Sequence, residues 1–228
     1  MFVPRVKICC IKSVDEAAMA VRYGASAIGL VSEMPSGPGP IPESLITEIS
    51  STIPPGVVSF LLTSLTDVGE IVEQQRRCRT NTIQLTDRLQ AGTYAELRTA
   101  LPGISIVQVI HVTAEEAIKE ARAVAPEVHA ILLDSGNPNL PKKELGGTGR
   151  THDWDISRRI KECVQVPIFL AGGLRGDNVA EAIRAVKPYA VDICSGVRTD
   201  GNLDEGKLAA FLEKVRQSLI REGGVPHA

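Results

Sequence analysis

The stretch at residues 166–197 reads VPIFLAGGLRGDNVAEAIRAVKPYAVDICSGV and contains two short apolar runs, each followed by glycine. Residues 166–170 (VPIFL) and 189–194 (YAVDIC) have the composition of strands that are buried on both faces. Between them, residues 178–186 have the apolar spacing of a helix. Strand, turn, helix, strand and turn make a βαβ unit, the building block of parallel α/β folds.

Both turns of this unit have the features of an anion site. Gly172 and Gly173 follow the first strand, and Ser195 and Gly196 follow the second. Glycine lets backbone N–H groups approach an anion without a Cβ in the way, and a helix N-terminus adds its dipole. In a (β/α)8 barrel the loops after strands seven and eight commonly bind phosphate. These turns therefore predict a phosphate site if six more strands precede them.

Six further apolar runs do precede this unit, and helical patterns separate them. The predicted strands are residues 6–10, 27–31, 57–62, 82–85, 104–112 and 129–134, and a last helix is predicted at 204–221. Eight strands then alternate with eight helices, at roughly 25–30 residues a unit. A doubly wound open sheet is the rival, but no GxGxxG fingerprint follows the first strand. We predict an α/β fold, a single (β/α)8 TIM barrel domain over residues 1–228.

Composition excludes several classes of protein. The net charge of −2 gives no electrostatic signature of a nucleic-acid or anionic-membrane partner, and no apolar run has the length of a membrane span. The five cysteines form no CxxC pair, which argues against a structural metal site or a disulfide framework. We expect a soluble, cytoplasmic, reduced protein without metal. Its size is compatible with a monomer or a homodimer.

Polar residues at the strand ends are the candidates for chemistry, because active sites of this fold lie there. The first strand supplies Lys7 and Cys9, the sixth supplies Asp134, and the eighth supplies Asp192 and Ser195. A thiol and a carboxyl group across a barrel mouth can act as base and acid. Partial burial would help the carboxylic acid to keep its proton.

Each candidate also has a structural interpretation. Cysteine at a strand end is more often packing than chemistry, and Asp134 could cap a turn. Asp192 lies inside an apolar run and could belong to a buried structural ion pair. The glycines at 146–149 could form a flexible loop. Three histidines are interpreted as structural or solvated: His111, His129 and His227.

Short motifs along almost the whole chain, taken in order, match one known family. They are Val6-Lys7-Ile8-Cys9, Leu132-Leu133-Asp134-Ser135, Gly146-Gly147-Thr148-Gly149, Ala171-Gly172-Gly173-Leu174 and Ser195-Gly196-Val197. The chain thereby resembles phosphoribosylanthranilate isomerase, a (β/α)8 enzyme family of tryptophan biosynthesis. The middle third, residues 55–110, matches only in its strand pattern.

The resemblance implies an Amadori rearrangement of N-(5-phosphoribosyl)anthranilate to 1-(2-carboxyphenylamino)-1-deoxyribulose 5-phosphate, with no metal or organic cofactor. A small phosphorylated sugar-amine is then the partner. Cys9 falls at the position of the family's general base and Asp134 at that of its general acid. The implied substrate and phosphate site consists of Lys7, Gly147, Gly172, Gly173, Asp192, Ser195 and Gly196.

The chain departs from the family's pattern around the substrate's aromatic end. The loop at 34–42 lacks the arginine that helps the family to hold anthranilate, Cys10 replaces a glycine, and Arg198 replaces a glutamate. Arg198 is a candidate for the missing positive charge. These departures keep two alternatives open: a related barrel isomerase acting on a different phosphoribosyl-amine or sugar phosphate, and a phosphosugar-binding barrel without catalysis.

Overall fold

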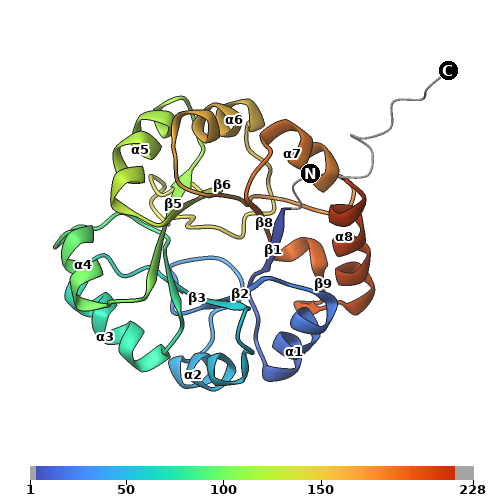
Figure 1. Ribbon diagram of the computed structural model, residues 1–228, viewed down its shortest axis with the longest axis horizontal. Helices are drawn as coiled ribbons and strands as arrows, with labels where there is room; N and C mark the ends of the chain where they lie inside the picture. Colours follow the sequence, from blue (N-terminus) through green and yellow to red (C-terminus); the bar gives the residue numbers. More distant parts are fainter. Residues whose placement is uncertain (1–3, 219–228) are drawn as a thin grey trace.

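Eight parallel strands close into a barrel in the order β1 to β8, and a helix follows each strand (Figure 1). The computed structural model describes residues 4–218. The strands are β1 Arg5–Ile8, β2 Ala27–Val31, β3 Val58–Thr63, β4 Thr82–Leu85, β5 Ser105–His111, β6 Ala130–Asp134, β7 Ile168–Leu170 and β8 Ala190–Ile193. The helices are α1 Val14–Tyr23, α2 Glu43–Thr52, α3 Val68–Cys78, α4 Tyr94–Ala100, α5 Glu116–Val124, α6 Trp154–Cys163, α7 Val179–Val186 and α8 Glu205–Gln217.

The predicted (β/α)8 barrel is confirmed, with small shifts at the ends of elements. The prediction of one domain over residues 1–228 stays a prediction, since it reaches beyond the described residues. The last residues of the helix predicted at 204–221, and His227, also lie outside them. No helix within residues 4–218 combines the length and the apolar character that a membrane span requires.

Side chains on each strand alternate between the helix layer and the inside of the barrel, as the period of two requires. Ile8, Ile28 and Ile83 belong to the large cluster between strands and helices. Phe60 and Phe169 belong to a separate cluster inside the barrel, where their rings meet edge to face with centroids 5.6 Å apart. The interior is therefore a packed core, and the polar side chains of the site rest on it.

Local capping explains where the first helix begins and ends. The Ser13 side chain accepts a hydrogen bond from the backbone N–H of Glu16 at 3.1 Å, which satisfies one free donor of the first turn. Gly24 ends α1 in the left-handed conformation, with φ of 100°.

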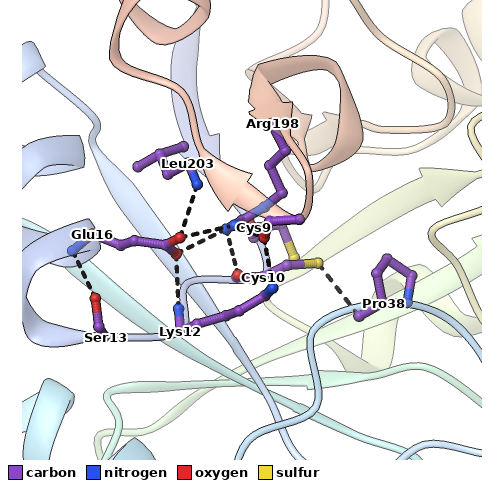
Figure 2. A network of polar contacts seen from close by, with 9 residues as sticks. Cys9, Cys10, Lys12, Ser13, Glu16, Pro38, Arg198 and Leu203 are labelled. Carbon is purple, nitrogen blue, oxygen red and sulfur yellow. Dashed lines mark hydrogen bonds and ion pairs between the residues drawn. The ribbon is translucent and has the colours of Figure 1, made fainter.

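A short extension separates β8 from α8. It consists of a 3-10 turn at Ser195–Val197 (η2) and a hairpin of two-residue strands, β9 Arg198–Thr199 and β10 Asn202–Leu203. Segments this short carry no periodic pattern, so sequence analysis does not predict them. The hairpin brings Arg198 and Leu203 against α1 (Figure 2).

We predict that Ile83→Ala lowers the free energy of unfolding by about 2–4 kcal/mol, because Ile83 is fully buried between strands and helices. Urea denaturation measures this change. Leu140→Ala is the matched control, since Leu140 is 39% exposed, and its effect should stay within about 0.5 kcal/mol. Equal effects of the two substitutions would contradict this assignment of the core.

Candidate active site

A pocket opens at the carboxyl end of the barrel, where the strands meet their loops. Its lining brings together residues that are far apart in sequence: they come from β2, β3, β4, β6 and β8, from the segments that follow β1 and β7, and from the loops at 34–38 and 145–149. Seven of the predicted site residues line this pocket: Cys9, Asp134, Gly147, Gly172, Gly173, Asp192 and Ser195. Lys7 and Gly196 are not in its lining.

Lys7 lies beneath the pocket and reaches it through Asp192. The two residues are register partners on β1 and β8, and Lys7 Nζ donates to Asp192 Oδ2 at 2.8 Å. Burial opposes the charge of Lys7, but the Asp192 carboxylate outweighs it and the pKa of Lys7 is raised. Asp192 Oδ1 is buried and accepts no hydrogen bond from the described residues. Asp192 is thus both a structural partner and a free acceptor in the pocket.

Cys9 follows the last residue of β1 and is buried. Gly29 on β2 makes room for it, because a Cβ there would lie 2.8 Å from Cys9 Sγ. The neighbouring Cys10 side chain lowers the pKa of the Cys9 thiol; burial opposes this effect, and the Lys7 ammonium lowers the pKa further. The net direction is downward, which favours the thiolate that a general base requires.

Asp134 ends β6 on another wall of the pocket, and its pKa is shifted in the opposite direction. Burial raises the pKa of its carboxyl group, and the charge of His111 and the backbone N–H of Ser135 offset part of that rise. His111 is the register partner of Asp134 on β5, so the interpretation of His111 as merely structural missed a neighbour of the site. Its position at the end of a predicted strand was the available signal.

Two loops meet over the pocket. In the loop after β2, Ser36 Oγ donates to the backbone carbonyl of Lys143 at 2.5 Å, and Pro38 packs against Gly147. Ser135 Oγ and Thr148 Oγ1 lie 2.7 Å apart and hold the second loop to the end of β6. The glycines at 146, 147 and 149 line the pocket and form its roof together with the loop after β2.

No positive side chain replaces the missing arginine: within residues 4–218, the pocket lining contains neither Lys nor Arg. Arg198 points elsewhere, because its guanidinium contacts Glu16 and the carbonyl of Cys10. The hypothesis that Arg198 supplies the missing charge in the pocket is therefore wrong.

The two glycine turns lie side by side at one end of the pocket. Gly173 has φ of 59°, and its carbonyl accepts from Asn178 Nδ2 at 3.0 Å, which fixes the first turn at the start of α7. Ser195 begins the η2 turn and lines the pocket. Gly196 is half-buried, and a Cβ there would lie 2.4 Å from the carbonyl oxygen of Leu174.

Sequence analysis missed Gln84 as a site residue. Gln84 lies on β4, lines the pocket, and has a buried Oε1 that accepts no hydrogen bond from the described residues. An amide between Ile83 and Leu85 in a buried strand was the available signal, because a buried polar group needs a partner. Cys194 also lines the pocket, next to Ser195.

We predict that Cys9 reacts with iodoacetamide at a pH below that of an ordinary thiol, because Cys10 and Lys7 favour its thiolate. The alkylation rate is measured against pH, with mass spectrometry to assign the modified cysteine. Cys9→Ser removes the signal and serves as the control. A midpoint at or above that of a free cysteine would contradict this account of the site.

Comparison with known proteins points to one family. The family model described as "N-(5'phosphoribosyl)anthranilate (PRA) isomerase" matches residues 6–214. The chain is 36% identical over 213 residues to N-(5'-phosphoribosyl)anthranilate isomerase from Methanocella arvoryzae, covering 93% of this chain and 98% of the relative.

Solved structures agree with this finding. Phosphoribosyl anthranilate isomerase from Thermococcus kodakaraensis has a TM-score of 0.77 and 30% identity, covering 94% of this chain and 99% of that one. Another phosphoribosyl anthranilate isomerase was solved with reduced 1-(o-carboxyphenylamino)-1-deoxyribulose 5-phosphate; it has a TM-score of 0.75 and 26% identity over 94% and 99% of the two chains.

Proposed function

The chain belongs to the N-(5'-phosphoribosyl)anthranilate isomerase family, and we propose that it catalyses the rearrangement of phosphoribosylanthranilate to 1-(2-carboxyphenylamino)-1-deoxyribulose 5-phosphate. This reaction is an aldose–ketose isomerisation, an intramolecular oxidation and reduction within tryptophan biosynthesis. The relative solved with the reduced product carries the same carboxyphenylamino and phosphate groups in its ligand.

One observation supports this proposal most strongly: a thiol and a carboxyl group line the same pocket with pKa values shifted in opposite directions. The pKa of Cys9 is lowered, which favours the thiolate, and the pKa of Asp134 is raised, which favours the neutral acid. Environments that separate the pKa values of two groups are typical of a base and an acid that act on one substrate. The proposed reaction needs one general base and one general acid.

In the proposed first step, Asp134 donates its proton to the furanose ring oxygen. The bond between this oxygen and C1 then breaks, and the nitrogen lone pair forms the C1–N double bond of a protonated Schiff base. Asp134 is left as a carboxylate beside His111, its register partner on β5. The roof formed by the glycine loop keeps water away from the Schiff base.

In the second step, the Cys9 thiolate removes the proton from C2. The electrons of the C–H bond form a C1–C2 double bond and neutralise the nitrogen, which yields an enolamine. Tautomerisation of the enolamine gives the ketone at C2 and a CH2 group at C1, so substrate and product have the same atoms. The Lys7 ammonium, within electrostatic reach of Cys9, stabilises the thiolate before the step.

We assign the substrate's phosphate to the two glycine turns, around Gly173 and Ser195. Both line the same end of the pocket, and η2 belongs to the loop after β8, where this fold commonly binds phosphate. Asp192 Oδ1 and Gln84 Oε1, both buried without a partner among the described residues, suit hydroxyl or amine groups of the substrate.

A related isomerase with another substrate is the runner-up, because the pocket lining lacks a cation for the anthranilate carboxylate. A binding protein without catalysis is a weaker alternative, since it would need neither the thiolate nor the neutral acid. The cytoplasmic location and the choice between monomer and homodimer stay predictions.

We predict that Asp134→Asn lowers kcat by about 10²–10⁴-fold, because the amide cannot donate a proton to the ring oxygen. Affinity for the reduced product should change by less than about threefold, since the amide has nearly the same shape as the carboxylic acid. Stopped-flow fluorescence measures turnover, and calorimetry measures affinity. Full activity in this variant would overturn the mechanism.

We predict that Gly173→Ala weakens binding of the reduced product by about tenfold or more. Gly173 adopts a left-handed conformation, and a Cβ there would lie 2.5 Å from the backbone of Arg150, so the turn must shift. Gly176→Ala is the matched control in the same loop, because a Cβ there meets nothing within 4 Å. Equal affinities of the two variants would place the phosphate elsewhere.

A further inference from the structure

Arg198 and Glu16 form an ion pair that is buried beside the β1 end of the site (Figure 2). Arg198 Nη1 lies 3.0 Å from Glu16 Oε1, and the two side chains are only 6% and 13% exposed. Among ion pairs of the described residues, only Lys7–Asp192 is more buried. Burying an ion pair costs desolvation free energy, so its role has to be inferred from the contacts that it makes.

Glu16 connects three segments through its carboxylate. It accepts hydrogen bonds from the backbone N–H groups of Lys12 and Leu203, both at 2.9 Å, in addition to those from Arg198. Lys12 belongs to the turn between β1 and α1, and Leu203 belongs to β10. Glu16 therefore fixes the guanidinium of Arg198 relative to the turn that carries Cys9.

Arg198 in turn holds the backbone of that turn. Its Nη2 donates to the carbonyl of Cys10 and, at 3.4 Å, to the carbonyl of Cys9. Cys10 has φ of 61°, a left-handed conformation that is unfavourable for a residue with a Cβ. The hydrogen bonds from Arg198 compensate this cost and hold the Cys10 peptide in one orientation.

The orientation of Cys10 determines what surrounds the Cys9 sulfur. The Cys10 side chain lowers the pKa of the neighbouring Cys9 thiol, and its Sγ donates to the carbonyl oxygen of Pro38 in the roof of the pocket at 3.6 Å. Cys194 also contacts the Cys10 thiol. A rotation of the Cys10 peptide would move its thiol away from Cys9.

We propose that Arg198, fixed by Glu16, is a positioning residue that holds the carbonyls of Cys9 and Cys10 and so keeps the Cys9 sulfur aimed at the reacting carbon. Arg198 lies outside the pocket lining and acts through the turn, without touching the substrate. This inference rests on the proposed role of Cys9 as the general base. It gives a role to Arg198, which the proposed mechanism leaves without one, and says how Cys10 is held beside Cys9.

The charged and titratable groups around the turn define what a test must separate. Lys7, Asp192 and Cys10 face Cys9, while Cys194 and Arg198 face Cys10. Replacing Arg198 alone leaves the Glu16 carboxylate buried without its cation, which destabilises the fold. The double substitution Arg198→Met with Glu16→Gln removes both charges and avoids this defect.

The test compares Arg198→Met, Arg198→Lys and the double variant. We expect kcat to fall about 10–100-fold in Arg198→Met and in the double variant, with KM changed by less than about threefold, because the base acts only in the transition state. The pH midpoint of Cys9 alkylation should rise by about one unit or more as the Cys10 thiol moves away from Cys9. Arg198→Lys should restore part of kcat and part of the low alkylation midpoint, since lysine can donate to one carbonyl.

Arg77→Met is the matched control, because Arg77 pairs with Glu43 on the helix layer, away from the pocket. The proposal is overturned if the double variant has the same kcat and the same pH midpoint of Cys9 alkylation as Arg77→Met. If Arg198→Met does not fold, the double and lysine variants carry the test. Failure of the wild-type protein to convert phosphoribosylanthranilate would reject the proposed function, while the alkylation profiles would still decide the role of Arg198.

Discussion

The ion pair between Lys7 and Asp192 lies where the barrel closes, because it joins β1, the first strand, to β8, the last. Neither charge could stay inside the barrel without the other, since removing one partner of a buried pair costs about 3–5 kcal/mol. The same pair sets the electrostatics of the pocket. Lys7 favours the thiolate of Cys9, and Asp192 offers its second oxygen to the pocket.

Burial acts in the same direction on both proposed catalytic groups, because it disfavours the charged form of a thiol and of a carboxylic acid alike. The neighbours make the difference. Cys9 has a hydrogen-bond donor and an ammonium group close by, so its pKa falls, whereas His111 and one backbone N–H offset only part of the rise at Asp134. One pocket can thereby hold a base and an acid at the same pH.

Much of this arrangement could be predicted from the sequence, because strand ends of a parallel barrel converge on one mouth. That rule alone selects Cys9, Asp134 and Asp192, and all three line the pocket. The Arg198–Glu16 contact could not be predicted, since it joins residues 182 positions apart through a hairpin of two-residue strands. The sequence marked Cys10 and Arg198 as departures from the family's pattern, and only the fold shows that they touch.

The most direct test of the central claim follows the fluorescence of freshly generated phosphoribosylanthranilate with the wild-type protein and with Cys9→Ser. The account predicts efficient consumption by the wild type and a loss of about 10²-fold or more in the variant, because serine does not form the anion that removes the C2 proton near neutral pH. A folded wild-type protein that leaves the substrate unchanged, or a variant as fast as the wild type, would contradict it.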